Sequence, residues 1–401
     1  MRRTPRIDGG DGSAGGPPPP PGVTAGRVRP AVTAVIVTYK RLDDARRCLR
    51  SIERQIYPNL ETIVIDNDSA GDVAATLGRE FPTARIYRAR SNVGLVRAQN
   101  AAVRLARGEY LLFLNDDTEL VDAGYVGAAV GLFERDPGLG AIGGEAVLGE
   151  AGRVAGVLYL RLRLNGVPKR QNLYELPAGE LRETDVLTGV HIFTRKALIE
   201  RIGGFDPFYF LHYDDADSTY RIARLGYRLA VMGRVPLAHW HSPVARRWDI
   251  RLQGRNRVYF ALKNLPWWRV LLLPLGDLWL VASRAVNVPR LVRRVRTIED
   301  PGEPGGLASK KLAYTRLAQD RGGGATAALR EAIDRTGYAL VEWFMGLLIL
   351  FGGYAFVLPH LGRAIRARRA SPDFLAEADL DQFTPIGTPE PVEVEAPPLA
   401  G

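Results

Sequence analysis

Short apolar runs alternate with amphipathic stretches from residue 31 to about residue 114. Four runs are rich in Val, Ile and Leu, as is typical of strands that are buried on both faces of a sheet. The three stretches between them repeat apolar side chains at helical spacing. This alternation predicts an α/β fold with a parallel, doubly wound sheet. The expected strands are 31–38, 61–66, 84–87 and 109–114, and the expected helices are 42–55, 72–80 and 94–107.

Polar residues follow three of these predicted strands. The carboxyl ends of parallel strands meet at one edge of a sheet, where ligands of such folds bind. We therefore expect these polar groups to lie around one ligand. They are Thr38-Tyr39-Lys40, Asp66-Asn67-Asp68 and Asn115-Asp116-Asp117.

The two ends of the chain lack this regular pattern. Residues 1–30 contain glycine pairs and a proline run with few apolar side chains, and residues 371–401 are acidic and rich in proline. Such segments bury too little apolar surface to offset the entropy of ordering, so both are expected to be disordered. The sequence thus predicts a tail at 1–30, an α/β domain at 31–265, a helical region at 266–370 and a second tail at 371–401.

The region 266–370 contains two apolar segments. Residues 267–286 are interrupted by Arg269, Pro274 and Asp277, which favours a helix lying in a membrane interface. Residues 338–361 are purer and long enough to cross a hydrocarbon layer of about 30 Å. A buried helical hairpin in a soluble oligomer is the alternative. Basic residues next to the second segment favour anionic lipid and the cytoplasmic side; they are Arg363, Arg366, Arg368 and Arg369.

Composition narrows the classes of function. The chain has 401 residues, a net charge of +10 and a single cysteine, Cys48. One cysteine excludes an internal disulfide framework and a cysteine-rich zinc site. A basic chain suits nucleic acid, an anionic membrane or phosphorylated ligands. Without a zinc finger, an RNA-binding aromatic signature or a basic coiled coil, no nucleic-acid partner is expected.

A second acidic cluster lies among aromatic residues at positions 203–221. It contains Asp214, Asp215 and Asp217. Carboxylates beside apolar rings have their charged form disfavoured, which raises the pKa toward the range of a general base. Asp217 and Arg221 are four residues apart and are expected to form an ordinary ion pair on a helix. Together with Asn115–Asp117, the cluster suggests one site with a metal and a base.

Several motifs in order give the chain a resemblance to family 2 glycosyltransferases of the GT-A fold, notably bacterial rhamnosyl-, galactofuranosyl- and related polysaccharide transferases. The resemblance covers about residues 31–265 and implies a Rossmann-like, mostly parallel sheet flanked by helices. The motifs are Val-Ile-Val-Thr-Tyr39, Ile-Val-Ile-Asp-Asn-Asp-Ser69, Asn92-Val-Gly94 through Asn100, Leu-Asn-Asp-Asp-Thr118, Leu187-Thr-Gly189, Gly-Gly-Phe-Asp206 and Asp-Asp-Ala-Asp217.

The resemblance implies a nucleotide-sugar site along the strand ends. Tyr39 would stack on a pyrimidine base, and Asp66 or Asn67 would accept the ring N–H. A core-covering Tyr39 and a helix-capping Asp66 are the structural alternatives. Arg97 would reach a phosphate or lie in solvent. The expected residues of the nucleotide-sugar site are Thr38, Tyr39, Asp66, Asn67, Asn92, Gly94, Asn100, Asn115 and Asp116.

The same resemblance implies a divalent cation, Mn²⁺ or Mg²⁺. Asn115-Asp116-Asp117 looks like the Asp-x-Asp motif of this fold with Asn in the first position. Asp117 is assigned to the metal, because hard cations choose oxygen ligands. His239 is assigned as the second ligand, with His241 as the alternative. An ordinary Asn- and Asp-rich turn is the structural interpretation of the acidic motif.

Asp215 is the expected general base, because the second member of the family's acidic pair, usually Glu-Asp, is catalytic. Asp214 replaces the usual Glu and would orient the acceptor together with Thr188 and Gly189. The implied enzyme is an inverting hexosyltransferase for envelope polysaccharide. It would move sugar from a UDP- or dTDP-sugar to a lipid-linked or polysaccharide hydroxyl at the cytoplasmic face of the membrane. A nucleotidyltransferase and a non-catalytic membrane scaffold are the alternatives.

Overall fold

The computed structural model describes residues 30–69, 71–148, 154–173, 176–177, 180–233, 237–239, 249–279, 347, 351–369 and 372–386. The expected tail at 1–30 lies outside the described residues, apart from Pro30.

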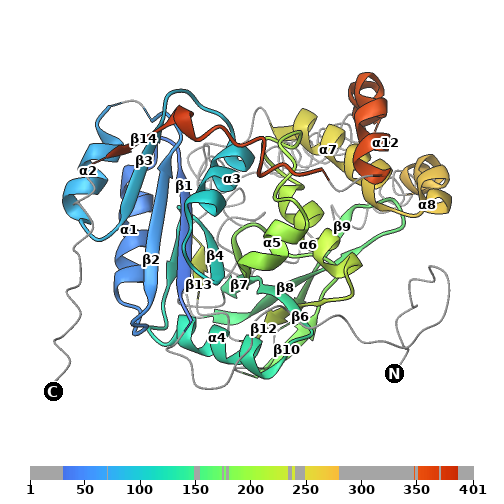
Figure 1. Cartoon of the computed structure of the whole chain (residues 1–401). Helices are drawn as coiled ribbons and strands as arrows, with labels where there is room; N and C mark the ends of the chain where they lie inside the picture. Colours follow the sequence, from blue (N-terminus) through green and yellow to red (C-terminus); the bar gives the residue numbers. More distant parts are fainter. Residues whose placement is uncertain are drawn as a thin grey trace, which may run out of the picture.

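The first half of the domain is the predicted βαβ layer (Figure 1). Its four strands pair in parallel in the spatial order β3-β2-β1-β4, and the intervening helices pack against them. The predicted strands and helices of this half are confirmed with ends shifted by at most a few residues. They are β1 (Val32–Thr38), α1 (Leu42–Glu53), β2 (Leu60–Asp66), α2 (Val73–Glu80), β3 (Arg85–Ala89), α3 (Leu95–Leu105) and β4 (Tyr110–Asn115).

The second half makes the sheet mixed rather than mostly parallel. Nine of the described strands form it, in the order β10-β12-β6-β11-β4-β1-β2-β3-β14. Among these described strands, β11 is antiparallel to both neighbours, and β10 and β14 are antiparallel edge strands. The expectation of a mostly parallel sheet was wrong here, because apolar runs show burial and not strand direction. The added strands are β6 (Leu139–Gly143), β10 (Leu181–Glu183), β11 (His191–Arg195), β12 (Arg228–Met232) and β14 (Phe383–Ile386).

Smaller elements complete the domain. A two-stranded sheet, β5 with β13, continues from the end of β4, and β7, β8 and β9 form a separate three-stranded sheet. The bounds are β5 (Thr118–Leu120), α4 (Tyr125–Arg135), β7 (Glu145–Leu148), β8 (Val154–Leu162), β9 (Pro168–Leu173), α5 (Lys196–Arg201), α6 (Asp214–Arg224), β13 (Leu237–His239), α7 (Asp249–Asn264), α8 (Trp267–Leu271), η3 (Leu358–His360), α12 (Leu361–Arg369) and η4 (Leu380–Gln382).

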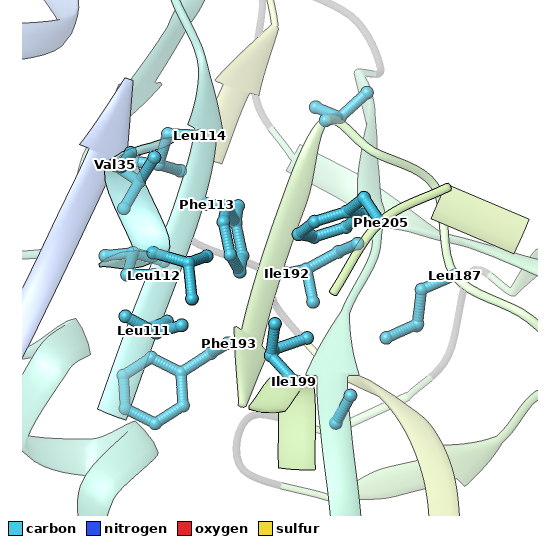
Figure 2. Close-up of a cluster of buried hydrophobic side chains, with 14 of the residues drawn as sticks. Val35, Leu111, Leu112, Phe113, Leu114, Leu187, Ile192, Phe193, Ile199 and Phe205 are labelled. Carbon is cyan, nitrogen blue, oxygen red and sulfur yellow. The ribbon is translucent and has the colours of Figure 1, made fainter. Parts of the chain in front are cut away.

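The hydrophobic core joins the two acidic motifs of the sequence. Figure 2 shows Phe113 of β4 beside Phe205 of the loop that follows α5, and the rings meet edge to face with centroids 5.1 Å apart. Phe113 lies two residues before Asn115, and Phe205 directly precedes Asp206. Burying two such rings is worth several kcal/mol, about 1.5–3 for each. The core therefore fixes where both polar segments leave the sheet.

Part of the predicted C-terminal tail is ordered, which corrects the expectation for 371–401. Residues 372–386 run from α12 past α3 to the edge of the sheet, where β14 pairs with β3 (Figure 1). Phe374 and Phe383 are buried, and Leu375 donates its N–H to the carbonyl of Gly203 at 3.1 Å. We call residues 372–386 the C-terminal strap. Residues 387–401 lie outside the described part.

The predicted apolar segments are only partly described. In the described ranges, no helix combines the length and apolarity needed to cross a bilayer. Of the expected segment 338–361, only residues 347 and 351–361 are described, so half of that segment lies outside the described part. Of 267–286, residues 267–279 are described, and α8 with the helical residues 273–279 carries several exposed apolar side chains.

Candidate functional site

The ends of β1 and β4 bring an acidic pair and an arginine together. Thr38 Oγ1 donates to Asp116 Oδ2 at 2.9 Å. Arg41, directly before α1, donates through Nη1 to Asp116 Oδ1 at 3.2 Å and to Asp117 Oδ2 at 2.9 Å. Both carboxylates are buried and Arg41 is half-buried. Charge-assisted bonds of this kind are stronger than neutral ones and set both carboxylates in place.

His239 reaches the same place through the small second sheet. β13 pairs antiparallel with β5, and His239 lies opposite Thr118. This register places His239 Nε2 3.3 Å from Asp117 Oδ1. The two residues that the sequence assigned to a metal are therefore neighbours. His241, the alternative, lies outside the described residues.

Burial and nearby cations separate the pKa values of the acidic pair. Burial raises the pKa of Asp116 to about 6, against the opposing charge of Arg41. Burial acts the same way on Asp117, but His239 and Arg41 outweigh it and hold the pKa of Asp117 below its ordinary value. Asp117 is thus the carboxylate that stays ionised most readily.

Asp117 and His239 fit part of a divalent cation site. An anionic oxygen and a neutral imidazole nitrogen are both accepted by Mn²⁺, and Mg²⁺ is commonly held by one or two carboxylates plus substrate phosphates. The described residues contain no group of three His, Cys, Asp or Glu side chains arranged to hold a metal. Asp117 and His239 are thus two candidate ligands, and a cation held here would take others besides them.

The end of β2 carries a carboxylate with one free oxygen. Asp66 is fully buried, and its Oδ1 accepts the Ser69 backbone N–H at 3.0 Å. Its Oδ2 has no hydrogen-bond partner among the described residues. A buried acceptor without a donor is unfavourable unless a ligand supplies one. Asp66 thus has the turn-capping role and an oxygen left over for the expected base contact.

Asn67 and Asn92 tie the loop before α3 to the end of β2. Asn67 Nδ2 donates to Asn92 Oδ1, and Asn67 Oδ1 accepts the Val93 N–H, both at 3.0 Å. Asn92 Oδ1 also accepts the Gly94 N–H at 3.0 Å. These bonds make the loop a rigid wall of the site. Tyr39 lies at the rim and is 40% exposed, which leaves part of its ring surface available for stacking.

Asn100 has a structural contact in place of the expected nucleotide contact. Its Nδ2 donates to the Phe205 carbonyl at 2.8 Å, and its Oδ1 accepts the Phe205 N–H at 2.9 Å. The side chain is buried, and both of its polar atoms are engaged. Asn100 therefore fixes the loop before Asp206. Its predicted role at the nucleotide finds no support in this geometry.

The second acidic cluster reaches the first through residues 188–190. Gly189 donates its N–H to Asp215 Oδ2 at 2.6 Å, and Asn115 donates its N–H to the carbonyl of Val190 at 3.1 Å. Asp215 Oδ1 accepts the Ala216 N–H at 2.7 Å. Gly189 and its neighbour Val190 thus hydrogen-bond to Asp215 and Asn115, which belong to the two acidic motifs that the sequence predicted would meet. These two bonds link the expected base to the strand ends.

The expected acceptor residues line this link. Thr188 is buried, and its hydroxyl has no hydrogen-bond partner among the described residues. A Cβ added at Gly189 would stand 3.3 Å from Asp215 Oδ2, so a larger residue would crowd the carboxylate. Asp214 is buried beside Asp215, which is half-buried. Asp215 is therefore the member of the pair that solvent or a substrate can reach.

The Asp214–Asp215 pair holds protons tightly. Burial, together with the charge of Asp215, raises the pKa of Asp214 to about 7. Burial also raises the pKa of Asp215, although the Ala216 and Gly189 N–H groups oppose it. Raised carboxylate pKa values near the operating pH are what general-base chemistry needs.

Asp217 belongs to a different environment. It is fully buried and accepts bonds from Arg221 Nε at 2.8 Å and from Lys263 Nζ at 2.9 Å, so the predicted Asp217–Arg221 ion pair is confirmed. Lys263 also contacts Asp206 at 2.9 Å. Burial would raise the pKa of Asp217, but these cations bring it to about 2. Asp217 is thus a structural anchor of α6.

Three contributors were not predicted from the sequence. Arg41 directly follows the polar end of the first strand, and a basic residue beside acidic strand ends was a usable signal. Lys263 carried a signal too, since a lysine directly after the apolar run 258–262 needs partners if it is buried. Asn256, fully buried on α7, had none, because its partners are the backbone carbonyls of Tyr209, Leu211 and His212.

The protein has an α/β fold, and its acidic site lies at the carboxyl ends of the strands with Arg41 and His239 beside it. Nucleotide-binding proteins of this fold class hold their ligands at the same edge of the sheet. Residues 33–175 match the family described as Glycosyl transferase family 2. This part of the chain is therefore similar to the family 2 glycosyltransferases.

Two relatives and one solved structure show the extent of similarity. The O-antigen biosynthesis protein RfbC of Myxococcus xanthus is 27% identical over 266 residues, which is 63% of this chain and 20% of RfbC. The glycosyltransferase YibD of Escherichia coli is 24% identical over 161 residues, 39% of this chain and 41% of YibD. The chain thus spans about a fifth of the length of RfbC.

The mannosyltransferase PcManGT of Pyrobaculum calidifontis, solved with GDP-Man and Mn²⁺, has 18% identity and a TM-score of 0.41 over 88% of this chain and 87% of that one. The similarity to the glycosyltransferase family thus rests on the sequence match over residues 33–175.

Proposed function

We propose that the chain transfers a sugar from a nucleoside-diphosphate donor to a hydroxyl of a lipid-linked or polysaccharide acceptor, with inversion at the anomeric carbon. The observation that carries the proposal is the link Asp215–Gly189–Val190–Asn115. It joins Asp215, an accessible carboxylate whose pKa is raised, to the Asp116–Asp117 pair at the strand ends, which Arg41 and His239 contact. A single-displacement transfer needs a base and an anion-binding centre side by side.

Asp215 would take the proton of the acceptor hydroxyl as its oxygen attacks the anomeric carbon. The Gly189 and Ala216 N–H groups hold one lone pair on each carboxylate oxygen and leave the others for the hydroxyl. They also fix the rotation of the carboxylate, so that the base is oriented before substrate arrives. Asp214 is buried, so it would not contact the acceptor. It would keep the negative charge of the base on Asp215.

The nucleotide would lie along the strand ends. Tyr39 would stack on the base, Asp66 Oδ2 would accept its ring N–H, and Asn67 with Asn92 would hold the neighbouring loop. Asp117 and His239 would hold Mn²⁺ or Mg²⁺, which when bound supplies positive charge to the diphosphate leaving group. A UDP- or dTDP-sugar is the expected donor, because the motif set resembles transferases that use them.

Turnover with a panel of UDP-, dTDP- and GDP-sugars tests the proposal. Membrane extract serves as the acceptor source, and each donor is run with Mn²⁺, with Mg²⁺ and with a chelator. We expect sugar transfer, detected by mass spectrometry, from one nucleotide class and only with metal. The configuration of the new bond, read by NMR, should be inverted. Nucleotide transfer in place of sugar transfer would favour a nucleotidyltransferase, and no turnover at all would favour a scaffold.

We further propose that the protein works at an anionic membrane surface facing the cytoplasm, where nucleotide-sugars are available. Support comes from exposed apolar side chains on α8 and the helical residues after it, which are Trp267, Trp268, Leu271, Leu275, Leu278 and Trp279. The Arg368 guanidinium of α12 lies 4.2 Å from the Trp267 ring centroid, so basic charge borders these side chains. Aromatic residues beside arginines suit the headgroup region.

Co-sedimentation with vesicles tests the membrane proposal. We expect binding to phosphatidylglycerol vesicles, little binding to neutral phosphatidylcholine vesicles, and a loss of binding when Trp267 and Trp268 are both replaced by Ser. Equal binding of this double variant would contradict the assignment of the surface to α8.

A further inference from the structure

An exposed aromatic ring lies in the turn that precedes the proposed base, and core packing does not explain its position. Phe210 lies five residues before Asp215 and is 42% exposed. One side of its ring rests on Gly94, since a Cβ added there would be 2.4 Å from the ring. Gly94 belongs to the loop held by Asn67 and Asn92. The ring therefore lies against the loop on the nucleotide side, in the turn that leads to α6 and the proposed base.

The neighbours of Phe210 in the loop face inward. Tyr209 is fully buried, with its hydroxyl donated to Asp217 at 3.0 Å. Phe208 stacks on Tyr259 with ring centroids 4.0 Å apart. The core of this segment is thus supplied by Phe208 and Tyr209. A third large ring turned outward adds nothing to that packing, and exposing it is unfavourable.

The backbone enforces this outward position. Phe210, His212 and Tyr213 all have left-handed φ, at 59°, 67° and 66°, which is costly for residues with a side chain. The buried Asn256 amide donates to the Tyr209 and Leu211 carbonyls, one on each side of Phe210, at 3.0 and 2.8 Å. The Asn256 hydrogen bonds thus hold a strained turn in which the Phe210 ring is exposed. Backbone strain that is maintained in this way is typical of a binding position.

We propose that Phe210 is the platform on which a sugar ring of the substrate packs during transfer. Sugars present an apolar C–H face that suits an aromatic ring, while their hydroxyls are left for polar groups nearby. The inference rests on the proposed function and identifies a specificity-determining contact within it. The sugar is either the one being transferred or the one carrying the acceptor hydroxyl, since Phe210 packs on the Gly94 loop and belongs to the turn that precedes Asp215.

Phe210→Ala tests the platform, with Phe210→Trp as the conservative variant. The assay uses whichever UDP- or dTDP-sugar the wild type turns over, with membrane extract as acceptor. Three quantities are measured: the KM for the donor in acceptor-free hydrolysis, the extract concentration giving half-maximal transfer, and the affinity for UDP or dTDP alone by calorimetry. Urea unfolding of each variant separates a folding defect from a binding defect.

We expect Phe210→Ala to raise one of the first two quantities about tenfold, equivalent to about 1.4 kcal/mol, with nucleotide affinity unchanged. A rise in the donor KM assigns the platform to the transferred sugar, and a rise in half-maximal extract assigns it to the acceptor sugar. Phe210→Trp should restore wild-type values. The inference is overturned if neither quantity changes, if nucleotide affinity falls in parallel, or if Trp fails to rescue. Absence of turnover in the wild type would instead contradict the proposed function.

Discussion

Two faces of helix α6 carry carboxylates with opposite surroundings. Asp217 faces Lys263 and Arg221 inside the protein, and its pKa lies near 2. Asp214 and Asp215, on the same helical turn, form no ion pair with a Lys or Arg side chain of the described residues, and burial raises the pKa of both. The pKa of Asp217 thus differs from those of Asp214 and Asp215 because Lys263 and Arg221 lie beside Asp217 alone among the three.

This contrast divides the acidic box into a structural and a reactive part. A carboxylate neutralised by buried cations has little affinity for a proton and serves to anchor the helix. A carboxylate held only by backbone N–H groups keeps its basicity and its orientation. The same sequence motif therefore supplies both the anchor and the proposed base.

Replacing the proposed base gives the largest expected effect. Asp215→Asn should lower kcat by about 10²- to 10⁴-fold, the usual contribution of a general base. The amide is isosteric but can accept only one of the two N–H bonds from Gly189 and Ala216, so the free energy of unfolding should fall by about 1–3 kcal/mol. The measurements are single-turnover sugar transfer and urea unfolding. Full activity in a folded Asp215→Asn protein would remove Asp215 from the mechanism.

Replacing the cation on the other face should affect stability instead. Lys263→Met leaves Asp206 and Asp217 short of a buried partner, and breaking such a pair typically costs about 3–5 kcal/mol. Lys196→Met is the matched control, because its ion pair with Glu200 is near the surface and worth about 1 kcal/mol or less. Urea unfolding measures both. Equal losses in the two variants would contradict a special role for the cations behind α6.

The strap offers a third comparison, between two glycines of left-handed φ. Gly203 has a φ of 73° and a Cβ there would lie 2.1 Å from the Pro372 carbonyl oxygen, whereas Gly71 has a φ of 83° and open space around it. Gly203→Ala should therefore cost about 1–3 kcal/mol more than Gly71→Ala, the usual cost of overpacking. Limited proteolysis should cut the strap faster in the Gly203 variant. Equal unfolding energies would mean that the strap does not depend on this contact.

The first half of the fold was predictable because its signals are local. Each of β1, β2 and β4 is a continuous apolar run ending in polar residues, and parallel pairing puts those ends together by topology alone. Asp116 beside Thr38 follows from that rule. The position of His239 beside Asp117 came from the family resemblance, since the β5–β13 pairing joins segments far apart in sequence.

The remainder depends on partners that local patterns do not encode. The strap looked disordered by composition, yet the buried rings of Phe374 and Phe383 and the pairing with β3 hold it on the domain. Gly203 and Gly204 belong to a motif of the family resemblance, and in the structure their missing side chains make room for the strap. Asn100 was placed at the nucleotide by the family motif, and its contact with Phe205 could not be predicted, because the two residues are 105 positions apart in sequence.

The smallest predicted effect concerns the pH dependence of stability. The pKa of Asp214 is raised to about 7, so the folded state binds its proton more tightly than the unfolded chain does. Stability contributed by this proton is present at low pH and is lost as pH rises through the folded-state pKa. A difference of 1 between the folded and unfolded pKa values corresponds to about 1.4 kcal/mol.

Asp214→Asn removes this titration while keeping the shape of the side chain. The variant should gain at least about 1.4 kcal/mol relative to wild type when urea unfolding is moved from pH 5 to pH 8.5. Asp217→Asn should instead lose a similar amount of stability at both pH values, because a depressed pKa stabilises the fold throughout the range above the pKa of an unfolded aspartate. Parallel pH profiles for the two variants would mean that the cations behind α6 do not separate the two faces.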